Sequence, residues 1–389
     1  MTTERHDDRR ARRIRLGMVG GGKGAFIGAV HRVAARLDDR FELVAGALSS
    51  TRDQSRASGQ ELGLEDDRNY GTFEEMASRE VQREDGIEAV AIVTPNHMHL
   101  PVASAFLERG IHVICDKPMT TTLAEAQELA ALVETSGRLF VLTHNYSGYP
   151  MIRQARQMVA AGALGGIRVV QVEYAQDWLA TRLEETGNKQ AGWRTDPARA
   201  GAGGCIGDIG THAYQLASFV SGLELESLAA DLTVFVPGRR LDDNAHVLLR
   251  FKGGAKGMLW ASQVAIGCAN ALTLRVYGER GGLDWQQESP DDLWYTPRGE
   301  PARRIRRGGA GAGEAATRVT RTPAGHPEGY LEAFATLYRE AADAILAARE
   351  GTAPSKDVTF PTLDDGIKGM AFVEACVRSS NNGAAWVEV

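Results

Sequence analysis

A glycine-rich turn between a strand and a helix is the feature that most restricts how this chain can fold. Residues 14–19 are a short apolar run that predicts a strand, and residues 26–37 have apolar positions at helical spacing. Between them, Gly20, Gly22 and Ala25 satisfy the pattern G-x-G-x-x-G/A. The first glycine of this pattern permits a tight turn, the second lets a pyrophosphate approach the backbone, and the small third residue allows close helix–strand packing. Because the strand and the helix are both present, we interpret the turn as a dinucleotide-binding site rather than an ordinary flexible turn.

Strands and helices continue to alternate after this turn, up to about residue 146. The apolar runs predict further strands over residues 41–48, 89–93, 111–114 and 139–142, with helices over residues 51–62, 100–107 and 123–133. The strand core at 90–93 is apolar at every position, as in a parallel sheet covered on both faces. We therefore expect an α/β fold that begins with a doubly wound Rossmann domain over residues 14–146, preceded by a flexible tail of residues 1–13.

The pattern changes in the second half of the chain. A helix over residues 151–160 is followed by runs that predict strands at 169–174, 228–236, 245–251, 257–264, 272–277 and 281–285, and then by helices over 328–349 and 364–379. Successive strands with glycine-rich turns predict a second α/β domain, residues 147–389, with a large, mostly antiparallel open sheet. We interpret Arg303, Arg304, Arg306 and Arg307 as part of a solvated loop beside a mobile, glycine-rich stretch at 308–313.

Composition excludes several classes of protein. The net charge is −6 with both signs scattered along the chain, so a nucleic-acid partner is not expected. An apolar run long enough to cross a membrane and the apolar core of a signal peptide are both lacking, so we expect a cytoplasmic protein without a membrane partner. The cysteines Cys115, Cys205, Cys268 and Cys376 are widely spaced, which favours free thiols in a reducing compartment and no metal site.

Two segments carry polar residues that suggest chemistry. Asp116 and Lys117 directly follow a predicted strand, and Asp208 and His212 lie four residues apart before an apolar helix, where one helical turn would place them on one face. Each has a structural alternative: a surface lysine, a helix N-cap, a hydrogen-bonded helix histidine. Together with a dinucleotide turn, the set favours a catalytic role.

These motifs, in this order, resemble the Gfo/Idh/MocA family, which includes glucose–fructose oxidoreductase and inositol dehydrogenases. The resemblance rests on the glycine turn, Thr94-Pro95-Asn96-x-x-His99, Asp116-Lys117-Pro118, and the run from Gly203 to His212. It implies a Rossmann domain, an open-sheet domain often used for oligomer contacts, and catalytic positions at Lys117, Asp208 and His212. The family usually has glutamate before the lysine, where this chain has Asp116.

The predicted cofactor is NAD, with NADP less favoured. An acid at the end of the second strand would read the ribose of NAD, but this chain offers Ser50, Arg52 and Asp53, which either face the ribose or cap the next helix. The residues expected to bind the cofactor are Gly20, Gly22, Lys23, Gly24, Ala25, Phe26, Ser49, Ser50, Arg52, Thr94, Pro95, Asn96, His99, Asp116, Lys117 and Asn145.

The expected substrate is a sugar. The segments 17–31, Thr143-His144-Asn145-Tyr146 and Gly192-Trp193-Arg194 resemble the members of the family that act on levoglucosan, an anhydro-glucose. This implies NAD-linked oxidation of its C3 hydroxyl to a 3-keto sugar. The residues expected to bind substrate are Lys117, Tyr146, Trp193, Arg194, Asp208 and His212, and further candidates for the pocket are Asn96, His99, Trp178 and Asp196. The tryptophans are equally compatible with core packing, and Glu328, beside His326, is explained by helix capping.

Oxidation of an alcohol requires a base, and His212 is the first candidate because its ordinary pKa lies near neutrality. Asp208 either orients His212 or binds the sugar. Lys117 either stabilises the reacting oxygen or is itself the base. The alternatives are an inositol dehydrogenase or another glucoside 3-dehydrogenase, a glycosidase that uses NAD, and a non-catalytic NAD-sensing regulator. An open sheet with an apolar face also predicts a homodimer or homotetramer.

Overall fold

The computed structural model describes residues 13–389, and these divide into two compact units. The first unit contains residues up to 119, then Ala124–Asn145 and Phe334–Asp364; the second contains Thr120–Leu123, Tyr146–Ala333 and Asp365–Val389. The predicted tail lies outside the described residues except for Arg13. The sequence predicted one unbroken second domain from residue 147, whereas residues 334–364 return to the first unit.

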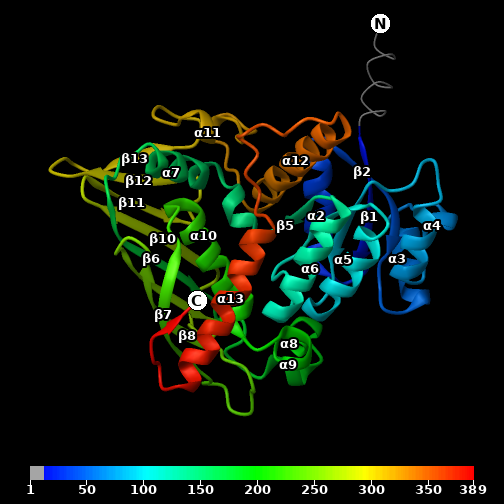
Figure 1. Cartoon of the computed structure of the whole chain (residues 1–389), viewed down its shortest axis with the longest axis horizontal. Coiled ribbons are helices and arrows are strands. Elements are labelled where there is room, and N and C mark those ends of the chain that lie inside the picture. The colour runs from blue at the N-terminus through cyan, green and yellow to red at the C-terminus, as the bar shows by residue number, and fades with distance from the viewer. Residues whose placement is uncertain (1–12) are drawn as a thin grey trace, which may run out of the picture. The chain divides into compact units, whose positions relative to one another are not determined.

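The first unit is built on a parallel sheet of five strands, in the order β2-β1-β3-β4-β5, which confirms the predicted Rossmann arrangement (Figure 1). Its strands are β1 (Ile14–Gly20), β2 (Phe41–Ala47), β3 (Ala89–Val93), β4 (His112–Cys115) and β5 (Phe140–Leu142). Since all five strands run the same way, the residues that follow them gather at one edge of the sheet.

Helices cover both faces of this sheet. The connection through α2 leads from β1 to one sheet edge, whereas those through α5 and α6 lead from β3 toward the other edge, so right-handed crossovers place them on opposite faces. Tyr338 joins α12 to the first unit: its hydroxyl lies 2.8 Å from His31 Nδ1, and its ring meets Phe41 edge-on. The helices are α2 (Phe26–Leu37), α3 (Arg52–Glu61), α4 (Phe73–Glu80), α5 (His99–Leu107), α6 (Leu123–Ser136) and α12 (Tyr330–Arg349). Helix α4 was not predicted from the sequence, although Thr72 and Glu75 have the spacing of a capping box.

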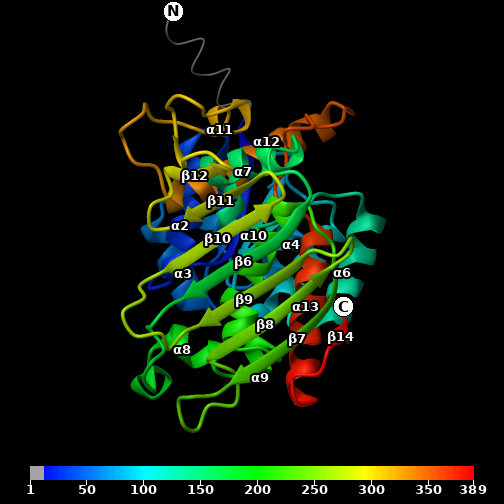
Figure 2. The ribbon, with the colours of Figure 1, turned by 90° about the vertical axis from the view of Figure 1, so that its left-hand side faces the viewer.

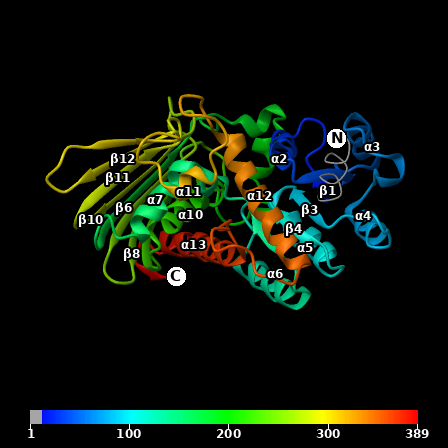
Figure 3. The ribbon, with the colours of Figure 1, turned by 90° about the horizontal axis from the view of Figure 1, so that it is seen from above.

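The second unit contains a nine-stranded sheet in the order β13-β12-β11-β10-β6-β9-β8-β7-β14. Only the β6–β9 pair of neighbours is parallel, so the prediction of a mostly antiparallel sheet is confirmed. Helices α7 (Pro150–Ala160), α10 (Thr211–Ser221) and α13 (Leu363–Asn381) lie against one face (Figure 3), while the strands of the other face are uncovered in Figure 2. The strands are β6 (Ile167–Ala175), β7 (Leu225–Thr233), β8 (Asn244–Phe251), β9 (Lys256–Ser262), β10 (Ala271–Gly278), β11 (Gly281–Gln286), β12 (Asp292–Pro297), β13 (Arg303–Arg306) and β14 (Val387–Glu388).

The arginine run forms an edge strand followed by a buried arginine, so the prediction of a loop was wrong, although Arg303, Arg304 and Arg306 are exposed to solvent. Arg303–Arg306 forms the edge strand β13, and Arg307 is only 1% exposed. The Arg307 guanidinium contacts Asp291 Oδ1 at 2.6 Å and Glu328 Oε1 at 3.2 Å, so its buried charge is compensated. Glu328 also accepts hydrogen bonds from the backbone of Arg321 and Thr322 and lies before the first residue of α12, so it anchors this segment and does not cap the helix.

The described residues contain neither a membrane-spanning helix nor a metal cluster. No helix within residues 13–389 is long and apolar enough to cross a membrane, and no group of three or more His, Cys, Asp or Glu side chains there is arranged to hold a metal ion. All four cysteines are free, and burial raises the pKa of Cys115, Cys205 and Cys376.

Candidate active site

The carboxyl edge of the parallel sheet gathers most of the predicted cofactor residues. Gly20 ends β1, and the other four strands are followed by Ser49 and Ser50, by Thr94, Pro95 and Asn96, by Asp116 and Lys117, and by Asn145. The connections leave β1 and β3 in opposite directions along the sheet. A crevice beside such a switch point is where open α/β sheets bind their ligands.

The glycine turn needs its small residues because two backbone segments approach it closely. A Cβ placed on Gly22 would lie 2.6 Å from the Leu48 carbonyl oxygen and 2.7 Å from Ser58 Oγ. Close packing of α2 on the turn occurs at Gly28, whose Cβ would lie 2.3 Å from Gly21 Cα. The sequence pattern predicted that packing role for Ala25, which instead is the N-cap of α2.

A hollow of about 470 Å³ lies over the turn. The Lys23 ammonium spans to Glu61 Oε1 at 2.6 Å, and its backbone N–H donates to Ser58 Oγ at 3.1 Å. Thr94 Oγ1 and Asn145 Nδ2, at the same sheet edge, are buried and have no hydrogen-bond partner among residues 13–389. A helix N-terminus without a side-chain cap, a glycine cradle and the unpaired atoms of Thr94 and Asn145 fit a dinucleotide. The hollow is lined by Gly22, Lys23, Gly24, Ala25, Phe26, Ala29, Arg32, Ser58, Glu61 and Leu62.

Lys117 lies in a tightly held loop of the first unit. Asp116 Oδ1 accepts from the Lys117 backbone N–H at 2.8 Å and from the Thr143 hydroxyl at 3.2 Å, which fixes the end of β4 against β5. His99 is fully buried, with Nδ1 2.8 Å from the Pro118 carbonyl and Nε2 3.0 Å from the Thr94 carbonyl. We therefore assign His99 the role of holding two loops together, in place of the direct cofactor contact predicted for it. Burial and the positive charge of Lys117 lower the pKa of His144 to about 3, so His144 is neutral at physiological pH.

In the second unit, Asp208 lies in a π-helical turn, Ile206–Gly210, that leads directly into α10, where His212 is the second residue. The buried Asp242 carboxylate fixes the start of this turn, accepting from Gly204 N at 2.6 Å, Ile206 N at 2.8 Å and the Cys205 thiol at 3.0 Å. A Cβ on Gly204 would lie 2.0 Å from the Asp242 carbonyl oxygen, which explains the glycine. π turns occur frequently at functional sites.

Two side chains hold the Asp208 carboxylate. Its Oδ2 atom accepts from Arg194 Nε at 3.0 Å and from Gln263 Nε2 at 2.9 Å. The Arg194 guanidinium lies over the Trp193 ring, 4.2 Å from its centroid, and 5.8 Å from that of Trp178. A hydrogen bond from a guanidinium to a carboxylate is of the strong, charge-assisted kind. Gln263 was not predicted from the sequence, because it follows β9 and contacts Asp208 only in the folded sheet.

A closed ring of hydrogen bonds lies beside His212. The Tyr146 and Tyr174 hydroxyls are 2.5 Å apart, Tyr174 donates to Asn270 Oδ1 at 2.8 Å, and Asn270 Nδ2 donates back to the Tyr146 hydroxyl at 3.2 Å. Ring centroids of His212 and Tyr146 are 4.9 Å apart in an edge-on arrangement. Burial raises the pKa of both tyrosines, which keeps them neutral. Tyr174 and Asn270 were not predicted, since no local motif marks them.

The predicted residues thus fall into two groups. The second unit brings Asp208, Arg194 and Trp193 together, and Tyr146 with His212, while Lys117 belongs to the first unit. Asp196 does not join the second group: it caps α9 (Pro197–Ala200) and forms an ion pair with Arg240.

Comparison with known proteins agrees with this arrangement. Residues 14–156 match the model of an oxidoreductase family with an NAD-binding Rossmann fold, and residues 152–284 match the GFO/IDH/MocA C-terminal domain. The chain belongs to the Gfo/Idh/MocA family. It is therefore an oxidoreductase with an NAD-binding domain.

The chain is similar to several named proteins over nearly its whole length. A solved oxidoreductase from Sinorhizobium meliloti is 58% identical, covers 96% of this chain and 99% of its own, and gives a TM-score of 0.87. An inositol dehydrogenase homolog from Azotobacter vinelandii, solved with NAD+, is 36% identical over 97% of this chain and 98% of its own, with a TM-score of 0.93; it was also solved with NADH and myo-inositol. Levoglucosan dehydrogenase from Pseudarthrobacter phenanthrenivorans is 28% identical over 97% of this chain and 98% of its own. A levoglucosan dehydrogenase solved with NADH and levoglucosan gives a TM-score of 0.82 at 26% identity, covering 97% of this chain and 99% of its own.

Proposed function

We propose that this protein oxidises one secondary hydroxyl of a neutral, polyhydroxylated ring, a cyclic polyol or a sugar, and transfers the hydride to NAD. The observation that carries the proposal is the Asp208 carboxylate, held by Arg194 and Gln263 on the same π turn that leads to His212. NAD supplies the hydride acceptor when bound.

The polar atoms of the second unit suit a neutral substrate. Arg194 compensates the charge of Asp208, so the pair does not demand a charged ligand. In the ring of hydrogen bonds, the Tyr146 and Tyr174 hydroxyl protons are both used within the ring, so Tyr146 offers a lone pair to a ligand. A carboxylate and a hydroxyl that accept hydrogen bonds select hydroxyl donors over carbonyl or phosphate groups.

We assign the roles as follows. His212 accepts the hydroxyl proton as general base, and Asp208 binds the substrate hydroxyls while its Oδ2 atom is held by Arg194 and Gln263. Lys117 stabilises negative charge as it develops on the reacting oxygen. The competing assignment makes Lys117 the base and His212 a hydrogen-bond partner.

We rank two candidate substrates by the sequence identity of the relatives that bind them. A cyclic polyol of the myo-inositol type comes first, because the relative solved with myo-inositol is 36% identical to this chain. Levoglucosan, oxidised at C3, comes second: its dehydrogenase is 28% identical, and the segment Gly192-Trp193-Arg194 resembles that subgroup.

The test is NADH absorbance with saturating NAD and a panel of myo-inositol, levoglucosan, glucose and methyl glucosides. We expect turnover of a neutral ring, abolished in the Asp208→Asn variant, which retains NAD binding. If NAD binds but no compound of the panel is turned over, the proposal is contradicted and an NAD-sensing regulator is favoured. Bound NAD that does not exchange, together with cleavage of glycosides, would favour the glycosidase.

We also expect a homo-oligomer. The uncovered face of the nine-stranded sheet carries exposed apolar side chains at Val169, Leu248, Met258, Tyr277 and Trp294. Light scattering that gives a monomer mass would contradict this expectation.

A further inference from the structure

The segment that follows β2 conflicts with the usual rule for NAD selectivity. In Rossmann domains an acid at the end of the second strand hydrogen-bonds the ribose of NAD, whereas a nearby arginine accommodates the 2′-phosphate of NADP. Here β2 ends at Ala47, two serines follow, and α3 begins at Arg52. By that rule Arg52 would favour NADP, although similar proteins were solved with NAD+ or NADH.

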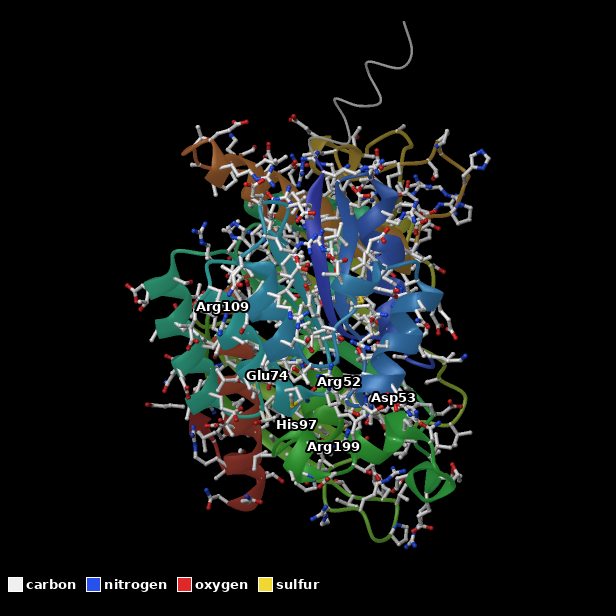
Figure 4. The ribbon with its side chains drawn as sticks, turned by 90° about the vertical axis from the view of Figure 1, so that its right-hand side faces the viewer. Arg52, Asp53, Glu74, His97, Arg109 and Arg199 are labelled. Atoms are coloured by element: carbon white, nitrogen blue, oxygen red, sulfur yellow. The ribbon has the colours of Figure 1, made fainter. Side chains whose placement is uncertain are left out.

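The position of the Arg52 side chain offers an explanation. It lies across Gly71, where an added Cβ would be 2.7 Å from the Arg52 guanidinium carbon. Its Nη2 atom then reaches Glu75 Oε2 on α4 at 3.3 Å. Figure 4 shows Arg52 and Asp53 at the start of α3, with Glu74 on the neighbouring α4.

Glu75 is well placed to hold a guanidinium. Its side chain is only 22% exposed, and its Oε1 atom lies 3.3 Å from Arg79 on the same helix. Its Oε2 atom is buried and has no hydrogen bond of good geometry among the described residues, so the ion pair with Arg52 is its compensation. The capping function of this position depends on the Glu75 backbone N–H, which donates to Thr72 Oγ1 at 3.2 Å.

We propose that Glu75 selects NAD over NADP by holding Arg52 in an ion pair and by adding a negative charge that opposes a 2′-phosphate. Four charged groups lie close together here: Arg52 and Arg79 both contact the Glu75 carboxylate, and Asp53 follows Arg52 in the first turn of α3. The local charge is therefore not positive, and a phosphate dianion gains no free cation. The inference rests on the use of NAD in the proposed function but not on the identity of the substrate.

The test measures dissociation constants by calorimetry for NAD, NADP, AMP and adenosine 2′,5′-bisphosphate. In the Glu75→Gln variant we expect the affinity for the two 2′-phosphorylated ligands to rise about tenfold, as expected for removal of one charge near a partly exposed anion. NAD and AMP affinities should change less than about twofold, because a 2′-hydroxyl is uncharged. Glutamine is accepted in a capping box, so the helix should be retained.

Glu74→Gln is the matched control, since Glu74 is an exposed neighbour on the same helix turn, whereas the ion pair of Arg52 is with Glu75. It should leave all four constants unchanged. The double variant Arg52→Ala with Glu75→Gln should lose most of the increase in affinity for the 2′-phosphorylated ligands. If that increase persists in the double variant, the role proposed for Arg52 is overturned. An unchanged or weaker NADP affinity in Glu75→Gln would overturn the whole proposal.

A measurement on the unmodified protein keeps the proposal testable if the variant does not fold. Salt screens repulsion as well as attraction. If Glu75 opposes the 2′-phosphate, the ratio of NADP to NAD affinity should rise with salt; a fall would mean that Arg52 binds the phosphate and would contradict the proposal. Because no reading depends on turnover, failure of the substrate assignment cannot be confused with failure of this one.

Discussion

In the first unit, much of the cofactor site consists of backbone at a glycine turn and strand ends, whereas in the second unit the substrate residues are side chains held by other side chains. Gly22 and Gly28 are required because they lack a Cβ atom, while the position of the Asp208 carboxylate depends on Arg194 and Gln263. A turn that needs glycine is specified by a few consecutive residues. A carboxylate held by side chains from two other segments is specified only by the complete fold.

This comparison has a practical consequence for mutagenesis. The cofactor site should tolerate changes of exposed side chains but not an added methyl group at a close backbone approach. The substrate residues should be sensitive to single atoms of polar side chains while NAD binding is retained. The predictions below test this division, from the largest expected effect to the smallest.

Substitution of His212 by Asn should have the largest effect. Removal of a general base lowers kcat by about 10²–10⁴-fold, and the fall of kcat toward low pH that reflects imidazole protonation should disappear. NAD affinity, measured by fluorescence titration, should remain. If Lys117→Met removes the acid limb and His212→Asn does not, Lys117 is the base.

Gly22→Ala should weaken NAD binding without a change in the second unit. The added methyl group would lie 2.6 Å from the Leu48 carbonyl oxygen, and overpacking of this kind costs about 1–3 kcal/mol, or about 5–150-fold if expressed in NAD affinity. The control is Gly369→Ala on α13, where a Cβ meets no atom within 4 Å. Equal NAD affinities for the two variants, by calorimetry, would show that the turn has room to relax.

Gln263→Leu should lower kcat/KM about tenfold with NAD affinity unchanged. A hydrogen bond to a charged group contributes about 1.5–3 kcal/mol, and part of this loss is recovered if water reaches Asp208. Gln263→Glu should be worse, because it places a second carboxylate 2.9 Å from the first. A Leu variant with unchanged kcat/KM would mean that Arg194 alone positions Asp208.

Acidification should weaken the first unit through its buried histidines. Burial lowers the pKa of His31 to about 4, and burial with the Lys117 charge lowers that of His144 to about 3. Both values lie below the ordinary value of 6.5, so the unfolded chain binds more protons. Stability that is complete above pH 6.5 is therefore lost as pH falls toward 4, by at most about 1.4 kcal/mol per pH unit for each histidine.

Spectroscopy can show in which unit the effect of pH on stability occurs. All six tryptophans, Trp178, Trp193, Trp260, Trp285, Trp294 and Trp386, belong to the second unit, so their fluorescence reports that unit while circular dichroism reports both. Urea unfolding at pH 7 and pH 5 should show a smaller pH effect in His31→Gln than in the unmodified protein. An equal pH effect in the two proteins would mean that His31 does not contribute.

Much of the fold and part of the site could be predicted from the sequence, and the reason is local. Alternating apolar runs predicted both sheets, and consecutive motifs indicated Gly20, Lys117, Asp208 and His212. Gln263 and Asn270 carry no local signal, and the capping-box spacing of Glu75 does not indicate its ion pair with Arg52, since each acts through a contact with a distant segment. Arg307 was misassigned for the same reason: its partners Asp291 and Glu328 lie 16 and 21 residues away.

The return of α12 to the first unit has a consequence for synthesis of the chain. A ribosome releases β1 to β5 early, but Tyr338, which covers His31 and Phe41, emerges only after strands β6 to β13 have been made. The sheet of the second unit is also completed late, because β14 (Val387–Glu388) pairs with β7. Both units are thus completed at nearly the same moment, and a fragment ending near residue 150 would leave the His31 face uncovered, however complete its five strands.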